Sequence, residues 1–444
     1  MAHELDRLVR DAVFGDATTR SAARKQIHLE ARKRGAVSSS VYPLYMAIGR
    51  GEVSRRFTVP AFNLRALTYD AACALFRAAK RHAVGAFIFE IARSEIGYTE
   101  QRPAEYSACV LAAAMREGFE GPVFIQGDHF QASAKKWATA EGRAAEIKAL
   151  ESLIDEALAA EFYNIDIDTS TLVDLSFKTR DEQQRANYEN TAHLTKHIRA
   201  KQPKSVTVSV GGEIGEVGKY NTRPDEVRAY MDGLRRLLGG TTGISKISVQ
   251  TGTSHGGVPL PDGTIAQARI DFNVLREVTA IGRKEYGIAG SVQHGASTLP
   301  ESVFNKFPES DAVEIHLATG FQNMILDAPS FPSDMRRAIR DFCFANAADE
   351  RKAGETEEQF VYKTRKKALG PFKQRMWDMP DAAKKPIIDA LEAKFEFLME
   401  KLGVFDTRDI VAKHVPVSPG ELPAYSAASE ELTAAAVVDP NEGE

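Results

Sequence analysis

Eight short apolar runs alternate with amphipathic windows between residues 57 and 327, and this rhythm restricts the fold more than any other feature of the chain. The runs, which are rich in strand-forming residues, are Val59–Leu64, Ala86–Ile91, Pro122–Gly127, Tyr163–Asp168, Val206–Glu213, Lys246–Thr251, Ile288–Gln293 and Ala312–Leu317. Helical patterns lie between most of them, at Tyr69–His82, Ala104–Arg116, Glu141–Ala160, Asp181–Lys201, Pro224–Leu238 and Gln267–Tyr286. Eight strands that alternate with helices over a span of this size predict an α/β fold of the (β/α)8 TIM-barrel type.

A doubly wound parallel sheet is the main alternative for such a rhythm. That fold usually carries a glycine-rich GxGxxG turn after its first strand. Here the first run continues as FNLRALT, residues 62–68, and contains no glycine. The barrel is therefore the preferred interpretation.

Segments of different character flank the barrel. Residues 1–50 carry apolar side chains at helical spacing and predict an N-terminal helical extension to a catalytic barrel domain at 51–330. Residues 331–414 are charged and lack strand signals, which predicts a C-terminal helical region that packs on the barrel or on a neighbouring subunit. Residues 415–444 are rich in Ala, Glu, Pro and Ser and predict a disordered tail.

The bulk composition excludes several classes of function. The 444 residues carry a formal net charge of −4, so no global basicity indicates a nucleic-acid partner. No apolar stretch is long enough to span a bilayer, and the N-terminus lacks a signal-peptide pattern. The three cysteines fit no disulfide or CxxC scheme. We therefore expect a cytoplasmic protein that binds neither nucleic acid nor membrane.

Polar side chains follow nearly every predicted strand. The C-terminal ends of barrel strands form one face of the molecule, where active sites lie. Core packing does not require side chains that bind metals, transfer protons or hold polar substrates at these positions. In chain order they are Asn63, Glu90, Ser94, Asp128, His129, Asp168, Ser170, Glu213, His255, His294, His316 and Thr319.

Three of the ten histidines, His129, His255 and His294, come just after such a run. A catalytic zinc site needs three protein ligands and one open position. The sequence therefore predicts a zinc site built from these imidazoles. Asp168 and Glu213 are candidates for an alternative or second metal position.

Asp128 directly precedes His129. Neighbouring residues on a regular strand point to opposite faces, so both reach one pocket only if they lie in a loop past the strand end. In that arrangement His129 binds the metal and Asp128 faces the substrate as an acid or base.

The loops that carry His255 and His294 are rich in Gly, Ser and Thr. Backbone N–H groups of such loops can hold an anion, and barrels often bind phosphate near their last two strands. The candidates for phosphate binding are Gly256, Gly295, Ser297 and Thr319, and Asn63, Ser94 and His316 are candidates for further substrate contacts.

A metal beside a phosphate site favours one kind of chemistry. The metal polarises a carbonyl and stabilises an enolate or ene-diolate, while a carboxylate handles the proton. Carbon–carbon cleavage of a phosphorylated ketose requires these steps. No lysine ends a predicted strand, so a Schiff-base route has no evident nucleophile. Arg93 is a candidate for a second, remote phosphate. A barrel hydrolase that uses zinc-bound water is an alternative.

The ordered motifs resemble the class II, metal-dependent ketose-bisphosphate aldolase family across residues 57–327. They are VPAFN (59–63), GDH (127–129), NIDIDTS (164–170), GGEIGEVG (211–218), TGTSHGG (251–257) and QHGAS (293–297).

This resemblance implies one catalytic Zn²⁺ on the three histidines and a possible second divalent or monovalent cation. It implies Asp128 as the proton-transfer residue, Glu213 near the metal and Asp168 at a secondary metal position. The implied reaction is the reversible cleavage of fructose 1,6-bisphosphate, or a close relative, to dihydroxyacetone phosphate and glyceraldehyde 3-phosphate through a zinc-stabilised ene-diolate. We also expect a homo-oligomer, either a dimer or a tetramer.

The chain departs from the usual family pattern at three places. Gln126 stands where a histidine is usual, Gly218-Lys219-Tyr220 stands in place of Gly-Gly-Glu, and His316 replaces an asparagine. Residues 87–106, FIFEIARSEIGYTEQRPAEY, are similar to the non-catalytic companion subunit of tagatose-bisphosphate aldolase. That subunit usually lacks the full histidine set, which this chain keeps. A catalytic protein is therefore preferred, with the accessory subunit as the alternative.

Overall fold

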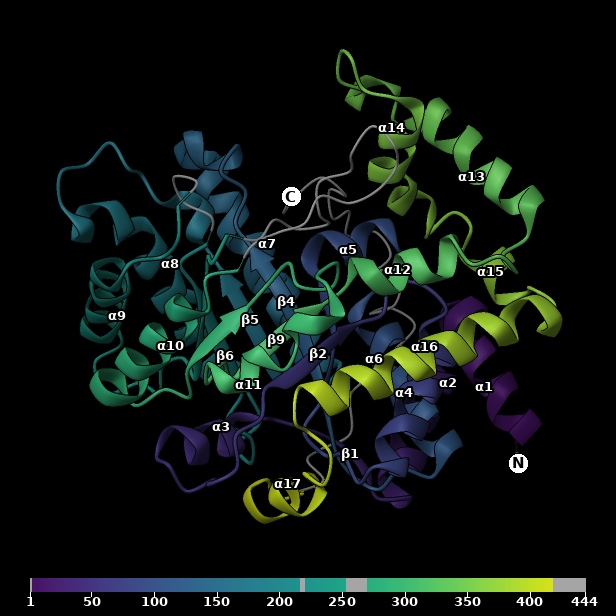
Figure 1. Ribbon diagram of the computed structural model, residues 1–444, viewed down its shortest axis with the longest axis horizontal. Coiled ribbons are helices and arrows are strands. Elements are labelled where there is room, and N and C mark those ends of the chain that lie inside the picture. Colours follow the sequence, from purple (N-terminus) through teal and green to yellow (C-terminus); the bar gives the residue numbers. More distant parts are fainter. Residues whose placement is uncertain (1, 216–219, 253–269, 418–444) are drawn as a thin grey trace.

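Nine parallel strands form one closed sheet in the computed structural model, which describes residues 2–215, 220–252 and 270–417 (Figure 1). The strands are β1 (Ala36–Ser39), β2 (Val59–Asn63), β3 (Ile88–Ala92), β4 (Gly121–Gln131), β5 (Asn164–Asp168), β6 (Ser209–Glu213), β7 (Lys246–Val249), β8 (Ser291–Gln293) and β9 (Glu314–Leu317). Their order is β1-β4-β3-β2-β9-β8-β7-β6-β5, and pairing of β4 with β5 closes the barrel. Strands β2 to β9 are the eight predicted runs, so the TIM barrel is confirmed.

Strand β1 is the one described strand that the sequence did not predict, because it lies inside the segment expected to be helical. It pairs in parallel with the first half of β4, from Ala36 opposite Gly121 to Ser39 opposite Phe124. The second half of β4 pairs instead with β5, beginning at Gln126 opposite Asn164. Strand β1 therefore fills the gap at the amino-terminal end of the barrel, where β4 and β5 have not yet met.

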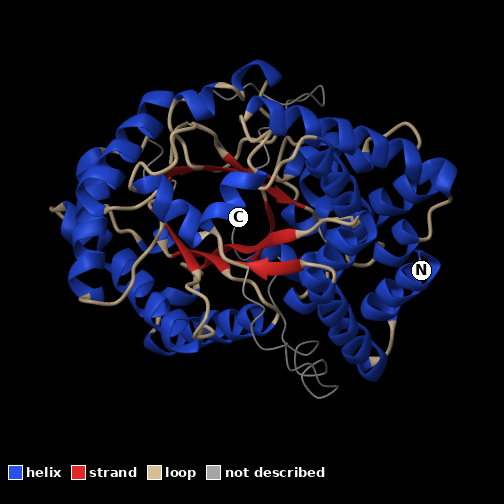
Figure 2. Ribbon diagram, turned by 90° about the horizontal axis from the view of Figure 1, so that it is seen from below, coloured by secondary structure: helices blue, strands red, loops and turns tan. Residues whose placement is uncertain are grey.

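Helices surround the strands on all sides in the end-on view (Figure 2). Proline or a capping residue marks several helix starts, as at Pro103, Thr179 and Pro224. Nine of the described helices follow barrel strands. They are α4 (Thr68–Arg81), α5 (Arg93–Tyr98), α6 (Pro103–Glu117), α7 (Ala140–Ala159), α8 (Arg180–Lys201), α9 (Pro224–Leu238), α10 (Phe272–Ile281), α11 (Lys306–Glu309) and α12 (Thr319–Leu326). Six of them overlap the predicted windows, whereas the short α5, α11 and α12 were not predicted. Short turns of helix are η1 (Lys136–Ala138), η2 (Ser170–Leu172), η3 (Gly282–Tyr286) and η4 (Glu301–Val303).

The chain adds helices before and after the barrel. Helices α1 and α2 pack on α6, and α16 packs along α4 and α12. The Phe395 ring of α16 lies 5.2 Å from the Phe62 ring of β2, so this helix covers the barrel wall itself. Helices α13 and α14 project away from the barrel (Figure 1). The added elements are α1 (Ala2–Phe14), α2 (Ala17–Lys33), α3 (Tyr42–Gly49), α13 (Ser333–Asn346), η5 (Ala348–Glu350), α14 (Glu357–Thr364), η6 (Arg365–Ala368), α15 (Lys373–Trp377), α16 (Asp381–Lys401) and α17 (Arg408–His414).

Among the helices of the described ranges, none combines the length and the apolar character that crossing a bilayer requires.

The inside of the barrel is polar in two layers. Residues two apart on a strand point to the same side, so each strand sends a pair of side chains inward. The lower layer contains Gln126, Asp166, Lys246 and Glu314, and the layer at the carboxyl ends contains Asp128, Asp168, Glu213, Ser248 and His316. The polar upper layer is the floor of the site described next.

Candidate active site

A bulge in β4 brings Asp128 and His129 to the same side of the strand. The predicted end of this strand at Gly127 is wrong, because β4 continues to Gln131. Its register with β5 shifts between Gly127 and Phe130, and His129 has a φ of 38°. This left-handed conformation is uncommon for a residue other than glycine. The expectation that both side chains reach one pocket is met by the bulge and not by a loop.

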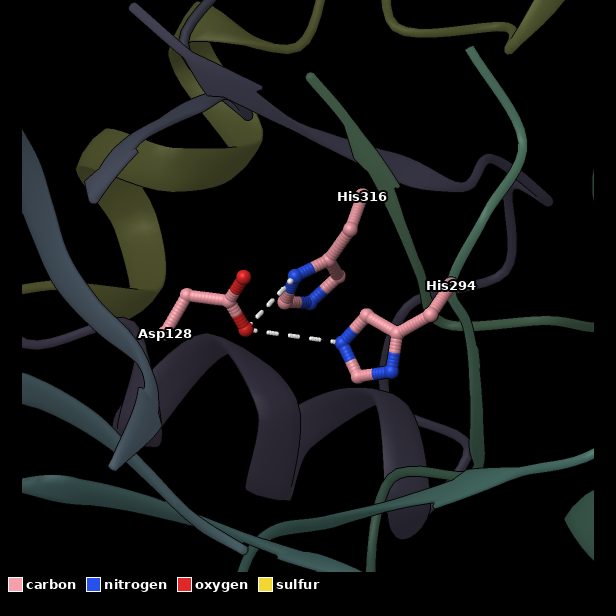
Figure 3. Close-up of side chains that lie close together, drawn as sticks. All are labelled: Asp128, His294 and His316. Carbon is pink, nitrogen blue, oxygen red and sulfur yellow. Dashed lines mark ion pairs between the residues drawn. The ribbon is translucent and has the colours of Figure 1, made fainter. Parts of the chain in front are cut away.

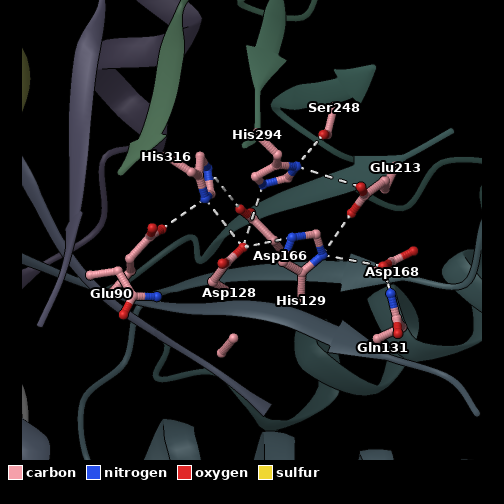
Figure 4. A network of polar contacts seen from close by, with 12 residues as sticks. Glu90, Asp128, His129, Gln131, Asp166, Asp168, Glu213, Ser248, His294 and His316 are labelled. Carbon is pink, nitrogen blue, oxygen red and sulfur yellow. Dashed lines mark hydrogen bonds and ion pairs between the residues drawn. The ribbon is translucent and has the colours of Figure 1, made fainter. Parts of the chain in front are cut away.

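His129 lies between two carboxylates, one from β5 and one from β6 (Figure 4). Its Nδ1 is 3.1 Å from Glu213 Oε2 and 3.2 Å from Asp168 Oδ2. Asp168 is held in turn by Ser170 Oγ, which donates to Oδ1 at 2.6 Å, and by the side-chain amide of Gln131. The two carboxylates thus fix the orientation of the imidazole.

His294 completes a group of metal-ligating atoms. Ligand atoms of His129, Glu213 and His294 all lie within 4.8 Å of one another. The second contact of Glu213 is to His294 Nδ1, at 3.5 Å, and Ser248 Oγ lies 2.6 Å from the same nitrogen. Two imidazoles and a carboxylate are ligands that a zinc ion accepts. His255, predicted as the third imidazole, lies outside the described residues.

Charge favours a cation in this group. Burial opposes ionisation of Glu213, but the charges of His129 and His294 outweigh it and hold its pKa well below the ordinary value. Burial also lowers the pKa of His129, and Asp128 and Glu213 more than reverse this, so that its pKa lies well above the ordinary value. Without a metal, protons on these imidazoles supply the positive charge beside Glu213. A bound metal ion would replace these protons and supply that charge itself.

Asp128 lies between His294 and His316 (Figure 3). Its Oδ1 is 3.5 Å from His294 Nε2 and 3.2 Å from His316 Nδ1. Burial raises its pKa, but the charges of His129 and His316 prevail and hold the pKa well below the ordinary value. Asp128 is therefore ionised.

His316 is held between acidic side chains. Its Nδ1 is 2.8 Å from Glu90 Oε2, and its Nε2 is 2.7 Å from Glu314 Oε1. Burial lowers its pKa, and Glu90 and Asp128 raise it well above the ordinary value. Ligand atoms of His316, His294 and Asp128 also lie within 4.8 Å of one another, so these three residues could hold a metal as well. Burial raises the pKa of Glu90 itself to about 8.

A lysine fills the barrel beneath the site. Lys246 is buried, and its Nζ lies 2.9 Å from Asp166 Oδ2 and 2.8 Å from Gln126 Oε1, with a further ion pair to Glu314. Burial lowers the pKa of Lys246, but Asp166 and Glu314 outweigh this and raise it. Asp166, Glu314 and His316 form another group with metal-ligand spacing, but the ammonium already balances its charge.

A cleft opens above these groups, and most of the predicted substrate-binding residues line it. Ser94, Gly295, Ser297, His316 and Thr319 all do so, next to Asp128, His129 and His294. Asn63 is buried at its edge and donates to Glu95 Oε2 at 2.6 Å. Gly256 lies outside the described residues.

Arg93 is not at the cleft. Its guanidinium binds the Glu146 carboxylate and the Gln131 carbonyl oxygen, so the hypothesis that it holds a remote phosphate is wrong. Among the cleft residues, Arg65, Glu90 and Glu95 were not predicted as a group. Glu90 was recognised at a strand end, but Arg65 and Glu95 lie in the segments that follow strands, where no motif distinguishes them.

A parallel barrel with histidines and carboxylates gathered at the carboxyl ends of its strands defines a TIM-barrel protein equipped to hold a metal ion. The family model "Fructose-bisphosphate aldolase class-II" matches residues 52–383, and the chain belongs to this family. The family resemblance seen in the sequence is thus confirmed. No curated protein sequence matches the chain.

Solved structures share the fold at low sequence identity. Fructuronate-tagaturonate epimerase UxaE from Cohnella laeviribosi has a TM-score of 0.57 and 11% identity, and the match covers 87% of this chain and 86% of that one. A probable tagatose 6 phosphate kinase from Sinorhizobium meliloti 1021 has a TM-score of 0.51 and 16% identity, over 85% of this chain and 98% of that one. Fructose-bisphosphate aldolase from Campylobacter jejuni has a TM-score of 0.46 and 16% identity, over 84% and 96% of the two chains. The first two, with TM-scores above 0.5, show the fold alone.

Proposed function

We propose that the protein is a zinc-dependent aldolase that cleaves fructose 1,6-bisphosphate, or a closely related ketose bisphosphate, to dihydroxyacetone phosphate and glyceraldehyde 3-phosphate. Membership of the class II family supports aldolase activity. The observation that carries the proposal is the meeting of His129, Glu213 and His294 directly beside the ionised Asp128.

The residues present fit a divalent ion. His129, Glu213 and His294 would hold it, with His255 as the further ligand that the family resemblance implies. A bound zinc ion supplies the Lewis acidity that polarises the substrate carbonyl and stabilises the negative charge left by bond cleavage. Asp168 contacts His129 and orients its ring, as a partner outside the ligand set does in many metal sites.

Asp128 performs the proton transfer in this account. In the cleavage direction its carboxylate accepts the proton of the hydroxyl group that becomes the aldehyde, as the carbon–carbon bond breaks. His316 Nδ1 and His294 Nε2 lie 3.2 and 3.5 Å from Asp128 Oδ1, so the two imidazoles flank the carboxylate. In the condensation direction the same carboxyl group returns the proton.

A Schiff-base route finds no support in the cleft. Among the described residues that line it there is no lysine. Lys246 is inside the barrel, but its ammonium is bound by Asp166 and Glu314 and stays protonated. A protonated amine does not attack a carbonyl.

The test is turnover of the purified protein with fructose and tagatose 1,6-bisphosphates, followed by coupling triose-phosphate release to NADH oxidation. We expect dihydroxyacetone phosphate from at least one of them. Zinc-loaded protein that forms no triose phosphate from any ketose phosphate would contradict the proposal. Protein that does not bind zinc and co-purifies with a smaller aldolase would favour the accessory-subunit alternative, and loss of phosphate without triose-phosphate formation would favour the hydrolase.

A further inference from the structure

Arg65 is a largely buried cation on the wall of the cleft. It follows β2, its side chain is 9% exposed, and it lines the cleft together with Ser94, Ser297 and Thr319. Neither the motifs nor the proposed proton transfer gives it a role. A charge in this position requires an explanation, because burying an arginine is costly unless its donors find acceptors.

Glu95 holds the arginine in place. Arg65 Nη2 lies 2.6 Å from Glu95 Oε1. The other oxygen of Glu95 accepts hydrogen bonds from Asn63 Nδ2 at 2.6 Å and from the Ala92 backbone N–H at 2.7 Å. The carboxylate is thus anchored to β2 and β3 and fixes the direction of the guanidinium, which is how a binding arginine is preorganised.

Several N–H donors of the Arg65 guanidinium make no short hydrogen bond. Of its five N–H groups, those on Nη1 reach Thr319 Oγ1 and Gln322 Oε1 only at 3.4 Å. Its Nε has no hydrogen-bond partner among the described residues. Since this Nε is also shielded from solvent, the Nη1 donors, which have only long contacts, are the ones available to a bound anion.

A second basic side chain lies near Arg65, and the carboxylates of Glu90, Glu95 and Asp128 line the same cleft. Lys366 of η6 packs near Arg65, and burial together with the charge of Arg65 lowers the pKa of this lysine to about 7. The positive charge of Arg65 therefore acts on Lys366, although Glu95 pairs with Arg65. Ser297 adds a donor, because its Oγ accepts from the Gly320 N–H at 3.1 Å and keeps its own hydroxyl proton for another acceptor.

We propose that Arg65 binds the anionic group of the substrate, a phosphate or a carboxylate, with Ser297 and Thr319 beside it. Glu95 and Asn63 then act as positioning residues for Arg65. The inference rests on the proposed function for the identity of the substrate as a ketose phosphate. It also takes over the role for which the sequence suggested Arg93.

The experiment is calorimetric titration with inorganic phosphate and, separately, with acetate. Wild-type protein is compared with Arg65→Met, Arg65→Lys and the matched control Arg24→Met, each with and without chelator. Arg24 is also buried, and its partner Glu105 lies 3.8 Å away, outside the cleft. The arm with chelator ensures that phosphate bound to a metal is not counted.

We expect Arg65→Met to weaken phosphate binding by about 10- to 100-fold, since hydrogen bonds to charged groups contribute this much. Arg65→Lys should lose less, because it keeps the charge and loses the fork. Arg24→Met should bind as the wild type does. Tighter binding of phosphate than of acetate identifies a phosphorylated substrate, and the reverse order identifies a sugar acid.

Equal anion affinities for wild type and Arg65→Met, or no anion binding by the wild type, would overturn the proposal. Circular dichroism reports whether Arg65→Met folds. If Arg65→Met does not fold, a phosphate affinity of Arg65→Lys equal to that of the wild type would overturn the proposal instead. The outcome is separate from that of the proposed function. If the protein has no aldolase turnover, the proposed function fails, but the titration still measures anion binding by Arg65. If Arg65 does not bind the substrate anion, the KM for ketose bisphosphate is the same in Arg65→Met as in the wild type.

Discussion

At the scale of single residues, the site depends on one unusual backbone conformation. His129 adopts a φ of 38°, and this bulge lets Asp128 and His129 face the same space from adjacent positions. Left-handed conformations of residues other than glycine cost free energy and cluster at functional sites. Here the bulge brings the Asp128 carboxylate next to an imidazole that could hold a metal.

Asp128→Asn should lower kcat by about 10²- to 10⁴-fold, because a general base is lost while the shape of the side chain is kept. Zinc content should stay at the wild-type level if the ion lies on His129, Glu213 and His294. It should fall if the ion lies on Asp128, His294 and His316, which also have metal-ligand spacing. Steady-state kinetics and metal analysis measure the two quantities. Asp174→Asn, an exposed aspartate, is the control. Retention of most activity by Asp128→Asn would remove it from the mechanism.

His255→Ala tests the predicted ligand that lies outside the described residues. The variant should bind zinc more weakly than the wild type and lose turnover, because the site would keep only two imidazoles. His193→Ala, an exposed histidine on α8, should change neither. Dialysis against a metal buffer followed by elemental analysis measures the affinity. Unchanged zinc binding in His255→Ala would exclude it from the ligand set.

The types of residue at the strand ends predicted much of this site from the sequence. Their chemistry explains why some site residues could be recognised and others could not. His129, His294, Asp128 and Glu213 stand at strand ends, and histidines and carboxylates there have few structural uses. Arg65 gave no such signal, because an arginine after a strand is usually solvated. Its role arises only when Glu95, thirty residues later in the chain, turns it toward the cleft.

At the scale of elements, β6 and β7 fit together because of a glycine. A Cβ atom on Gly211 would lie 2.2 Å from Asp166 Oδ1 and 3.0 Å from Lys246 Cε. The absence of a side chain makes room for the buried ion pair of Lys246 and Asp166.

Gly211→Ala should destabilise the protein by about 1–3 kcal/mol, since overpacking forces neighbours out of place. Gly240→Ala is the matched control, because nothing lies within 4 Å of a Cβ atom there. Chemical denaturation compares the free energies of unfolding of both variants with that of the wild type. Equal stability of Gly211→Ala and Gly240→Ala would show that the lower layer adapts without cost.

The amino-terminal end of the barrel is joined to α2 by a buried ion pair. Glu161, which precedes β5, has Oε2 2.7 Å from His28 Nδ1, and its other oxygen pairs with Arg32. Its backbone carbonyl accepts a hydrogen bond from Ser38 Oγ of β1 at 2.6 Å. Burial raises the pKa of Glu161, but the hydrogen bond and charge of His28 outweigh this and lower it.

This lowered pKa gives a pH dependence with a definite sign. A carboxyl group whose folded pKa is below its unfolded value stabilises the protein above the unfolded pKa. That contribution is lost as the pH falls from about 4 through the lower folded value. Glu161→Gln should therefore be less stable than the wild type by about 1–3 kcal/mol at pH 7, with a gap that narrows below about pH 4.

Denaturation of both proteins between pH 3 and 8 measures this gap, using buffers of about the same ionic strength throughout. The exposed Glu189→Gln should match the wild type over the whole range. A gap that is constant with pH, or one that widens in acid, would contradict the assignment.

The elements were more predictable than their ends. Each barrel strand is a short apolar run, and a helical segment separates most neighbouring runs. This alternation allowed all eight strands to be recognised. Strand β1 has only four residues, Ala-Val-Ser-Ser, and too little pattern to reveal itself. The bulge in β4 was also hidden, because nothing in the letters GDHF distinguishes a loop from a strand with one left-handed residue.

At the scale of the whole molecule, one of the added helices packs directly against the barrel wall. Helix α16 covers the wall near β2, where Phe62, Phe321 and Phe395 pack ring against ring. The expectation that the C-terminal region packs on the barrel is met by this helix. The homo-oligomeric state and the segment boundaries stay predictions.

The central claim is that a zinc ion at this site is needed for aldol cleavage. The most direct measurement is the turnover of fructose and tagatose 1,6-bisphosphates by chelator-treated protein as zinc is added back in known amounts. We predict that turnover is lost on chelation and returns in proportion to zinc, with saturation at about one ion per chain. Full turnover by metal-free protein, or a covalent adduct trapped by borohydride with substrate, would contradict the account.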